Sequence, residues 1–403
     1  MLSESYLYTR EMIEEALEHL SPDGILCAQF GEIEFLLKPN RVVRYLGTAR
    51  QAFAELEIPD FAQHVLVALS PGFGKLETAT ILIKKSPFTQ ADLETFAEST
   101  AVLGGAQQIY TPASPDPGSS ITKAITLEGD DLEQFYQEHP YKVRPIDDDA
   151  PFFWHFVSFP DALFGSDRTE RFNVEEGIGE RLLIVLLIAA TLLGALFLLA
   201  PLVFLRDVWN RIPHKLAAGA YFAALGLGFM FLEISLIQRL TLFLGYPTYS
   251  LTITLFAILL STGCGSLLSE RWAAQPRRAM SGLAVILITL VVFYELALDP
   301  IVDVAVGEPL ALRIGITIAL LAPLGLCLGC FMPLGLGAIS TLTEEHSDEY
   351  VAWCWAVNGF FSVVASVLAT VLSMTIGFGQ VMFVGLAIYL IGILAFRRIP
   401  SLG

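Results

Sequence analysis

Hydrophobic residues follow two different patterns along the chain, and the change comes near residue 181. After that point they form runs of about 20 residues, the length that an α-helix needs to cross the ~30 Å hydrocarbon core of a bilayer. The runs predict seven spans, at 182–205, 216–237, 248–268, 279–298, 310–332, 352–373 and 377–396. Because the links between them are short, residues 181–403 are predicted to form a compact, all-α transmembrane bundle of about seven helices.

Small residues and a few polar side chains stand out within the predicted spans. Gly325 and Gly329 form a GxxxG pattern, which predicts close packing between helices. A carboxylate inside a membrane is costly unless it has a partner, so Glu233 is a candidate for either a structural pair or a ligand or proton site. Asn358 is expected to make a helix–helix hydrogen bond, and Arg239 to extend toward the membrane interface.

The first part of the chain has shorter hydrophobic periods. They predict, in order, a helix at 9–20, the strand ILCAQF, a helix at about 41–57 and two further strands, HVLVALS and TATILIKKS. Alternating helices and strands that end in an antiparallel pair predict part of an α/β sheet over residues 1–143. Residues 1–60 contain no glycine-rich turn of the nucleotide-binding kind. The pattern therefore resembles the second half of a nucleotide-binding sheet without its first half.

Charge separates the same two parts of the chain. Residues 1–180 hold 30 acidic and 13 basic side chains, whereas residues 181–403 hold 11 of each, so the net charge of −17 comes from the first part. The sequence therefore predicts an acidic soluble domain followed by a membrane domain whose partner is the lipid bilayer. The lack of a Lys/Arg-rich run argues against nucleic acid as a partner.

Basic residues in the links predict the orientation of the bundle. They follow the first, third and last predicted spans: Arg206, Arg211, Lys215, Arg271, Arg277, Arg278, Arg397 and Arg398. With seven spans these three places share one side, which the positive-inside rule assigns to the cytoplasm. We therefore predict a multi-pass protein of the inner (plasma) membrane, with the soluble domain on the non-cytoplasmic side.

The densest acid cluster runs directly into the densest aromatic cluster in RPIDDDAPFFWHF, which begins at residue 144. Its candidate ligand or docking residues are Asp147, Asp148, Asp149, Trp154 and His155. One interpretation makes the carboxylates and the histidine a site for a cation, a polyamine or a metal. The other makes residues 144–180 a linker strap whose aromatic side chains fasten the soluble domain to the bundle. We favour the strap, because no second His stands at metal-ligand spacing.

Cysteine usage adds no further site. CLGC at 327–330 has the spacing of a redox motif, but it lies in an apolar run without a nearby His or carboxylate. We expect these two cysteines to pack between helices rather than to bind a metal. No metal site is therefore predicted.

Several of these stretches together resemble one family. LSESYLYTREMIEEALEHLSPDGILCAQF resembles the second half of the Rossmann-like domain in membrane-embedded spermidine synthase-like proteins, and RPIDDDAPFFWHF is similar to the segment that ends that domain. The membrane spans of the same family are similar to two further stretches, YFAALGLGFMFLEISLIQRLTLFLGYPTYSLT and VAWCWAVNGFFSVVASVLATVLSMTIGFG. The resemblance covers essentially the whole chain. It implies a partial Rossmann-like, class I methyltransferase-like domain at residues 1–143, of which only the C-terminal part is present.

The resemblance also implies a chemistry that this chain does not carry by itself. Soluble spermidine synthases transfer an aminopropyl group from decarboxylated S-adenosylmethionine to putrescine. Their cofactor loop, ribose-binding acid and catalytic Asp lie upstream of the matched segment, and none has a counterpart here. No catalytic or cofactor-binding residue is therefore assigned. S-adenosylmethionine or its decarboxylated form is expected only if further sequence or a partner chain supplies the missing half.

Three functions remain open. We favour a non-catalytic accessory or structural subunit of a membrane complex, with other membrane protein subunits as partners. The predicted topology supports this choice, because S-adenosylmethionine is a cytosolic cofactor and the soluble domain is predicted outside the cytoplasm. The alternative is the C-terminal part of a membrane-bound aminopropyl- or methyltransferase. A transporter is the third function, with Glu233 as its one obvious coupling group.

Overall fold

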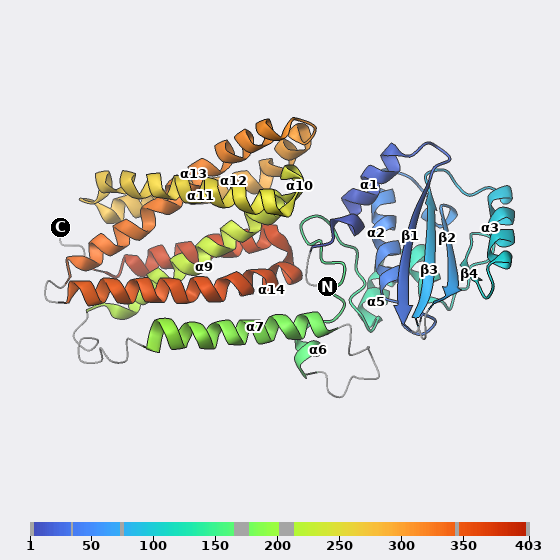
Figure 1. The fold of residues 1–403 in the computed structure, drawn as a ribbon, viewed down its shortest axis with the longest axis horizontal. Helices are drawn as coiled ribbons and strands as arrows, with labels where there is room; N and C mark the ends of the chain where they lie inside the picture. The colour runs from blue at the N-terminus through green and yellow to red at the C-terminus, as the bar shows by residue number, and fades with distance from the viewer. Residues whose placement is uncertain are drawn as a thin grey trace. The chain divides into compact units, whose positions relative to one another are not determined.

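The computed structural model describes residues 4–33, 35–72, 76–164, 177–200, 213–342 and 346–399. The chain divides into two compact units, Met1–Leu182 and Leu183–Gly403, which are described separately below (Figure 1). Two of the arginines used for the predicted orientation, Arg206 and Arg211, lie outside the described residues, as do positions 165–176 of the predicted strap.

Unit 1 contains a four-stranded sheet. Its strands are β1 (Ile25–Ile33), β2 (Val65–Pro71), β3 (Leu76–Lys84) and β4 (Gln107–Tyr110). Their order is β1-β3-β2-β4, and every neighbouring pair is antiparallel. β1 and β2 therefore run in the same direction, with β3 between them. The predicted strands are confirmed and so is the mixed α/β class, but a four-stranded antiparallel sheet does not establish a Rossmann-like fold.

Helices connect and flank these strands. They are η1 (Tyr6–Tyr8), α1 (Arg10–His19), α2 (Arg41–Glu55), η2 (Phe61–Gln63), α3 (Gln90–Val102), α4 (Ser120–Thr126), α5 (Gly129–Glu138) and α6 (Phe159–Phe164). The two helices predicted before β2 are confirmed as α1 and α2. α3 begins with a capping box, in which Thr89 and Asp92 each bond the other's backbone N–H, so two otherwise unpaired donors are satisfied.

The sheet of unit 1 has a hydrophobic layer on each face, because side chains alternate along its strands. Val65 and Val67 belong to the larger cluster, which includes the buried residues of α2. Leu66 and Ala68 point the other way and pack with Phe96 of α3. In Figure 1, α2 and α3 lie on opposite sides of the sheet.

All the secondary-structure elements in the described residues of unit 2 are helices. Its elements are α7 (Ile178–Gly194, which begins in unit 1), η5 (Ala195–Leu199), α9 (Lys215–Arg239), α10 (Thr241–Leu244), α11 (Pro247–Ser269), η7 (Glu270–Trp272), α12 (Pro276–Ala305), α13 (Leu310–Ser340) and α14 (Ser347–Phe396). Six helices among the described residues are long and apolar enough to cross a membrane. By length and composition this is the pattern of a multi-pass membrane protein.

The last of the six, α14, is two helices joined at Gly377, which has φ 81° and ψ 165°. A residue with positive φ and extended ψ cannot continue a helix, and only glycine adopts that conformation readily. The first arm follows α9 in the same direction. A Cβ on Gly219 of α9 would meet Trp353, and one on Gly226 would meet Ser362.

The second arm of α14 runs along α9 in the opposite direction. A Cβ on Gly228 would meet Tyr389, whereas one on Gly392 would meet Ala224, four residues earlier in α9. The two arms therefore form a helical hairpin that turns at Gly377. This turn matches the predicted boundary between spans 352–373 and 377–396, so the six helices contain seven apolar segments.

Close packing between α11 and α13 confirms the role predicted for the GxxxG pattern. A Cβ on Gly325 would lie 2.5 Å from the Ser261 Cβ, and one on Gly329 would lie 2.1 Å from the Thr262 carbonyl oxygen. Neither position has room for a side chain, so both glycines let the two helix backbones approach each other. Cys327 and Cys330, in the same helix, are buried among apolar side chains, as expected.

Candidate functional site

The aromatic residues after the acid cluster lie in the hydrophobic core of unit 1. Phe153 and Phe156 are 0% and 1% exposed, and the Phe153 ring stacks on Phe30 of β1 with centroids 5.3 Å apart. Trp154 is half-buried and makes an edge contact with the Phe153 ring. The segment is thus an integral part of unit 1. Its predicted second role, fastening that unit to the bundle, stays a prediction.

A buried arginine of α2 holds this segment in place. The Arg44 guanidinium, 4% exposed as a residue, donates to the carbonyl oxygens of Phe153 at 2.6 Å and His155 at 3.0 Å, and also to that of Lys142. It lies over the Phe156 ring, 4.6 Å from the centroid. The hydrogen-bond partners of this buried cation are therefore backbone carbonyl groups rather than a carboxylate. Sequence analysis missed Arg44, although its place among the apolar positions of a predicted helix was a usable signal.

His155 is engaged through both ring nitrogens. Its Nδ1 lies 2.8 Å from Oε1 of Glu180, and its Nε2 lies 2.9 Å from Nζ of Lys142. Because an ionised carboxylate only accepts, Nδ1 carries the proton and Nε2 accepts from the lysine ammonium. Burial lowers the pKa of both His155 and Lys142. With neither nitrogen free, the ring is a hydrogen-bonded packing residue rather than a ligand.

The three residues of the acid cluster make different contacts within unit 1. Asp147 accepts from the backbone N–H of Ala150 at 3.0 Å, which closes a turn. The Asp148 N–H donates to Oε2 of Glu11 in α1 at 3.0 Å, and burial raises the pKa of the Asp148 carboxyl to about 6. Asp149 lies near enough to Tyr6 to act on its ionisation. Among the described residues no group of three or more His, Cys, Asp or Glu could hold a metal ion.

A further carboxyl, absent from the sequence-based candidates, lies at the start of α2. Glu32 is 1% exposed, and its Oε1 accepts from the Val42 N–H at 2.8 Å. Burial raises the pKa of this carboxyl to about 7. Glu32 caps the helix from the neighbouring strand, a contact across ten residues that the local sequence pattern does not signal.

The two edges of the sheet are built differently. β4 is four residues long and its pairing with β2 contains a register irregularity, two features that discourage a further strand. β1 is nine residues long and, in the described part of the chain, pairs on one side only. Its one charged side chain is the buried Glu32, and Cys27 and Gln29 are exposed. β1 therefore lacks the charges, prolines and bulges that usually protect an edge.

The intramembrane candidates make different contacts. Asn358 of α14 donates from Nδ2 to the Phe222 carbonyl of α9 at 3.2 Å, the helix–helix hydrogen bond that was predicted. Glu233 is 6% exposed, and its Oε1 has no hydrogen-bond partner among the described residues. The guanidinium of Arg239 is paired, and its expected extension toward the membrane interface stays a prediction. Its side chain is only 7% exposed, because the guanidinium pairs with Glu295 at 3.0 Å and with Asp299 at 2.8 Å.

The candidate residues predicted from the sequence do not form a single site. The acid and aromatic residues lie in unit 1, and Glu233, Arg239 and Asn358 lie on helices of unit 2. Glu233 and Arg239 share α9, but the arginine is satisfied by carboxylates of α12, so no pair between the two is formed. Comparison with protein-family models, with curated proteins and with solved structures found no match.

Proposed function

We propose that this chain is an integral membrane protein that acts through protein contacts, as a non-catalytic accessory or structural subunit of a membrane complex. The proposal rests on the edge of β1 that pairs with no strand in the described part of the chain. A strand of another polypeptide that pairs with this edge would satisfy its outward backbone groups and extend the sheet. The membrane helices would hold that partner at the bilayer surface.

The composition of β1 supports this use of the edge. A long strand without an exposed charge or a proline is an association site unless something covers it. In ILCAQFGEI the only charged residue is Glu32, whose carboxyl is turned to the α2 N-terminus. At the opposite edge β4 is short and irregular. Natural sheets place such protection where association is unwanted, so the contrast favours β1 as the interface.

A spermidine synthase-like ancestry would also make the edge of β1 the interface. β1 and β2 are parallel and are joined by the crossover helix α2, which is the arrangement of an open α/β sheet. In the spermidine synthase-like family, the half that carries the cofactor loop and catalytic Asp precedes the part resembled here. That half would meet the present sheet at β1, the first strand. A docking subunit derived from such a domain would keep the β1 edge as its interface and would lack the cofactor loop and the catalytic Asp.

In the alternative proposal, the β1 edge joins the two halves of an enzyme. If the other half is supplied by further sequence or by a partner chain, β1 becomes an internal strand of a membrane-bound aminopropyl- or methyltransferase. S-adenosylmethionine or its decarboxylated form would then bind in the supplied half. Isothermal titration of both compounds into the protein purified from its native membrane, together with whatever chains copurify with it, separates the two proposals. We expect no heat of binding, whereas a clear signal at micromolar ligand would overturn the non-catalytic role.

A site-specific cross-link tests the edge itself. Cys27, on β1, is exposed and can carry a thiol-directed photo-crosslinker. The matched control combines Cys27→Ser with Gln107→Cys, which moves the crosslinker to exposed β4, and both proteins carry Cys264→Ser to remove the other exposed thiol. In native membranes we expect one discrete adduct from β1, with the crosslinked peptide of the partner in an extended segment, and none from β4. Equal labelling from both edges, or none from β1, would contradict the proposal.

A further inference from the structure

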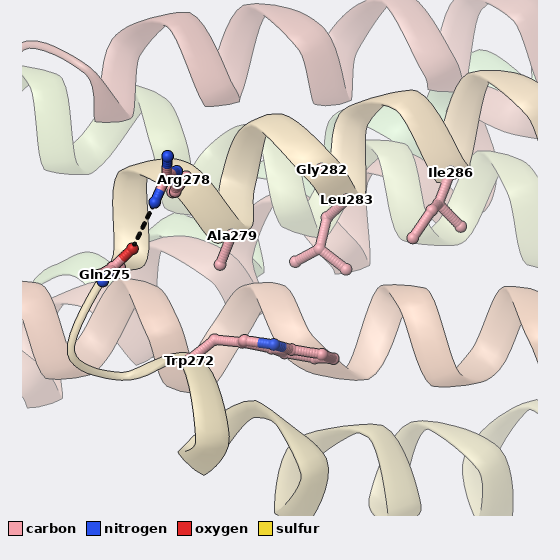
Figure 2. Close-up of a pocket in the computed structure, with 7 residues that line it drawn as sticks. All are labelled: Trp272, Gln275, Arg278, Ala279, Gly282, Leu283 and Ile286. Atoms are coloured by element: carbon pink, nitrogen blue, oxygen red, sulfur yellow. Dashed lines mark hydrogen bonds between the residues drawn. The ribbon is translucent and has the colours of Figure 1, made fainter.

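A pocket of about 310 Å³ opens beside the first turns of α12. It is lined by Trp272, Gln275, Arg278, Ala279, Gly282, Leu283 and Ile286. Figure 2 shows the Trp272 ring opposite the side chains of Ala279, Leu283 and Ile286, with Gln275 and Arg278 together at one end. The pocket therefore has an apolar length and a polar end.

The helical spacing of small residues produces the apolar length. Ala279, Gly282 and Ile286 follow one another at three- and four-residue intervals, so they lie along one stripe of α12. A Cβ added to Gly282 would meet nothing within 4 Å, which leaves open space in the middle of this stripe. Trp272, contributed by the preceding turn η7, is 40% exposed and forms the opposite wall. Hydrocarbon is the ligand that such a surface accommodates best.

Arg278 supplies a positive charge that no described carboxylate neutralises. Its Nη1 donates to the Gln275 Oε1 at 3.3 Å, and no ion pair of Arg278 with a described residue lies within 4 Å. The neighbouring Arg277 is used differently, because its guanidinium donates to the Ile399 carbonyl at 2.8 Å. The polar end of the pocket thus presents a cation and an amide, a combination that suits a phosphate.

We propose that this pocket binds one anionic phospholipid, with its phosphate at Arg278 and Gln275 and part of one acyl chain along Ala279, Gly282 and Ile286. α12 is one of the helices long and apolar enough to cross a membrane, and Arg and Trp residues at the end of such a helix mark the headgroup level. A phospholipid carries both the anion and the hydrocarbon that the two ends of the pocket require. Free phosphate would use only the polar end.

Native mass spectrometry of the full chain in detergent tests this site. The protein is titrated with phosphatidylglycerol and, separately, with phosphatidylcholine of the same acyl chains. Arg278→Gln removes the cation and is expected to weaken phosphatidylglycerol binding about tenfold, to the level of phosphatidylcholine. Gly282→Leu fills the apolar length and is expected to weaken binding of both lipids.

Matched controls keep the result specific. Gly263→Leu places a leucine at a glycine of α11 that also has open space, and Arg271→Gln removes an exposed arginine outside the pocket lining. Both should bind phosphatidylglycerol as the parent protein does. The proposal is overturned if the pocket variants bind like the controls. It is also overturned if millimolar inorganic phosphate displaces the lipid, which would assign the polar end to a free anion.

Discussion

Nδ1 of His155 lies 2.8 Å from Oε1 of Glu180, and the two side chains are 5% and 2% exposed. Glu180 is in the first turn of α7, whereas His155 follows the aromatic run that fills the core of unit 1. Unit 1 therefore includes the beginning of this helix. The ring is held in one tautomer from both sides, since Lys142 donates to its other nitrogen.

Removing the acceptor of this bond should destabilise the unit. Glu180→Leu leaves the buried N–H of His155 without a partner, which costs about 1–3 kcal/mol. We expect faster hydrogen exchange in peptides that cover residues 150–160. Glu98→Leu, at an exposed position of α3, is the control and should leave exchange in that segment unchanged. Parent-like protection in both variants would show that the bond contributes nothing.

Glu32 should give unit 1 a pH dependence of defined sign. Burial raises the pKa of its carboxyl from 4.5 to about 7, so between these values the folded protein binds more protons than the unfolded chain. The free energy of unfolding contributed by this group therefore falls as the pH rises through the same window, by up to about 1.4 kcal/mol per pH unit. Glu32→Gln should remove this contribution.

Hydrogen exchange of α2 peptides, corrected for intrinsic rates, measures the effect at pH 5 and pH 8. The amide introduced by Glu32→Gln still offers an acceptor to Val42, so the variant should gain protection relative to the parent protein at pH 8 but not at pH 5. Glu98→Gln should keep the parent's pH slope. Identical slopes in all three proteins would mean that Glu32 is ionised in the folded state.

The contact between α11 and α13 predicts opposite outcomes for two glycines of one helix. A Cβ at Gly329 would overlap the Thr262 carbonyl, so Gly329→Ala should destabilise the bundle by about 1–3 kcal/mol. At Gly337 a Cβ meets nothing within 4 Å, and alanine there should be neutral or stabilising by up to about 1 kcal/mol. Melting temperatures in detergent distinguish the two, and a smaller loss for Gly329→Ala than for Gly337→Ala would contradict the packing.

Glu233 and Glu295 should respond differently to the same substitution. Glu233 is buried and its Oε1 has no partner among the described residues, so a glutamine of equal shape, which cannot ionise, should preserve or raise the melting temperature. Glu295 pairs with Arg239, and Glu295→Gln should lower it. A hydrophobic carbodiimide should label the Glu233 carboxyl in the parent protein. A large loss of stability in Glu233→Gln would instead indicate that this carboxylate holds a cation.

Features set by neighbouring residues could be predicted from the sequence. The capping box of Thr89 and Asp92 needs only a three-residue spacing. The break at Gly377 lies at the predicted boundary between the spans 352–373 and 377–396, and the close approach at Gly325 and Gly329 was indicated by their GxxxG pattern. In each case the signal lies within a few neighbouring residues, so the local pattern carries the information.

Features that depend on distant partners could not be predicted. Arg44 and Phe153 are separated by 109 positions, and nothing near either residue indicates the other. The ion pairs of Arg239 were not predicted either, because its partners, Glu295 and Asp299, are 56 and 60 positions away. β4 was also missed, since a four-residue strand of QQIY has too short a pattern to distinguish it from a loop.

The hydrogen bonds from Arg44 to the backbone at residues 142–155 set an order of events during synthesis. The helix that carries Arg44 is made before these acceptors, so its buried guanidinium finds them only after about a hundred further residues have been added. The last of these acceptors precedes the apolar helix α7, which begins at Ile178, by a short stretch of chain. Unit 1 therefore completes its core at about the time that the growing polypeptide presents this apolar helix.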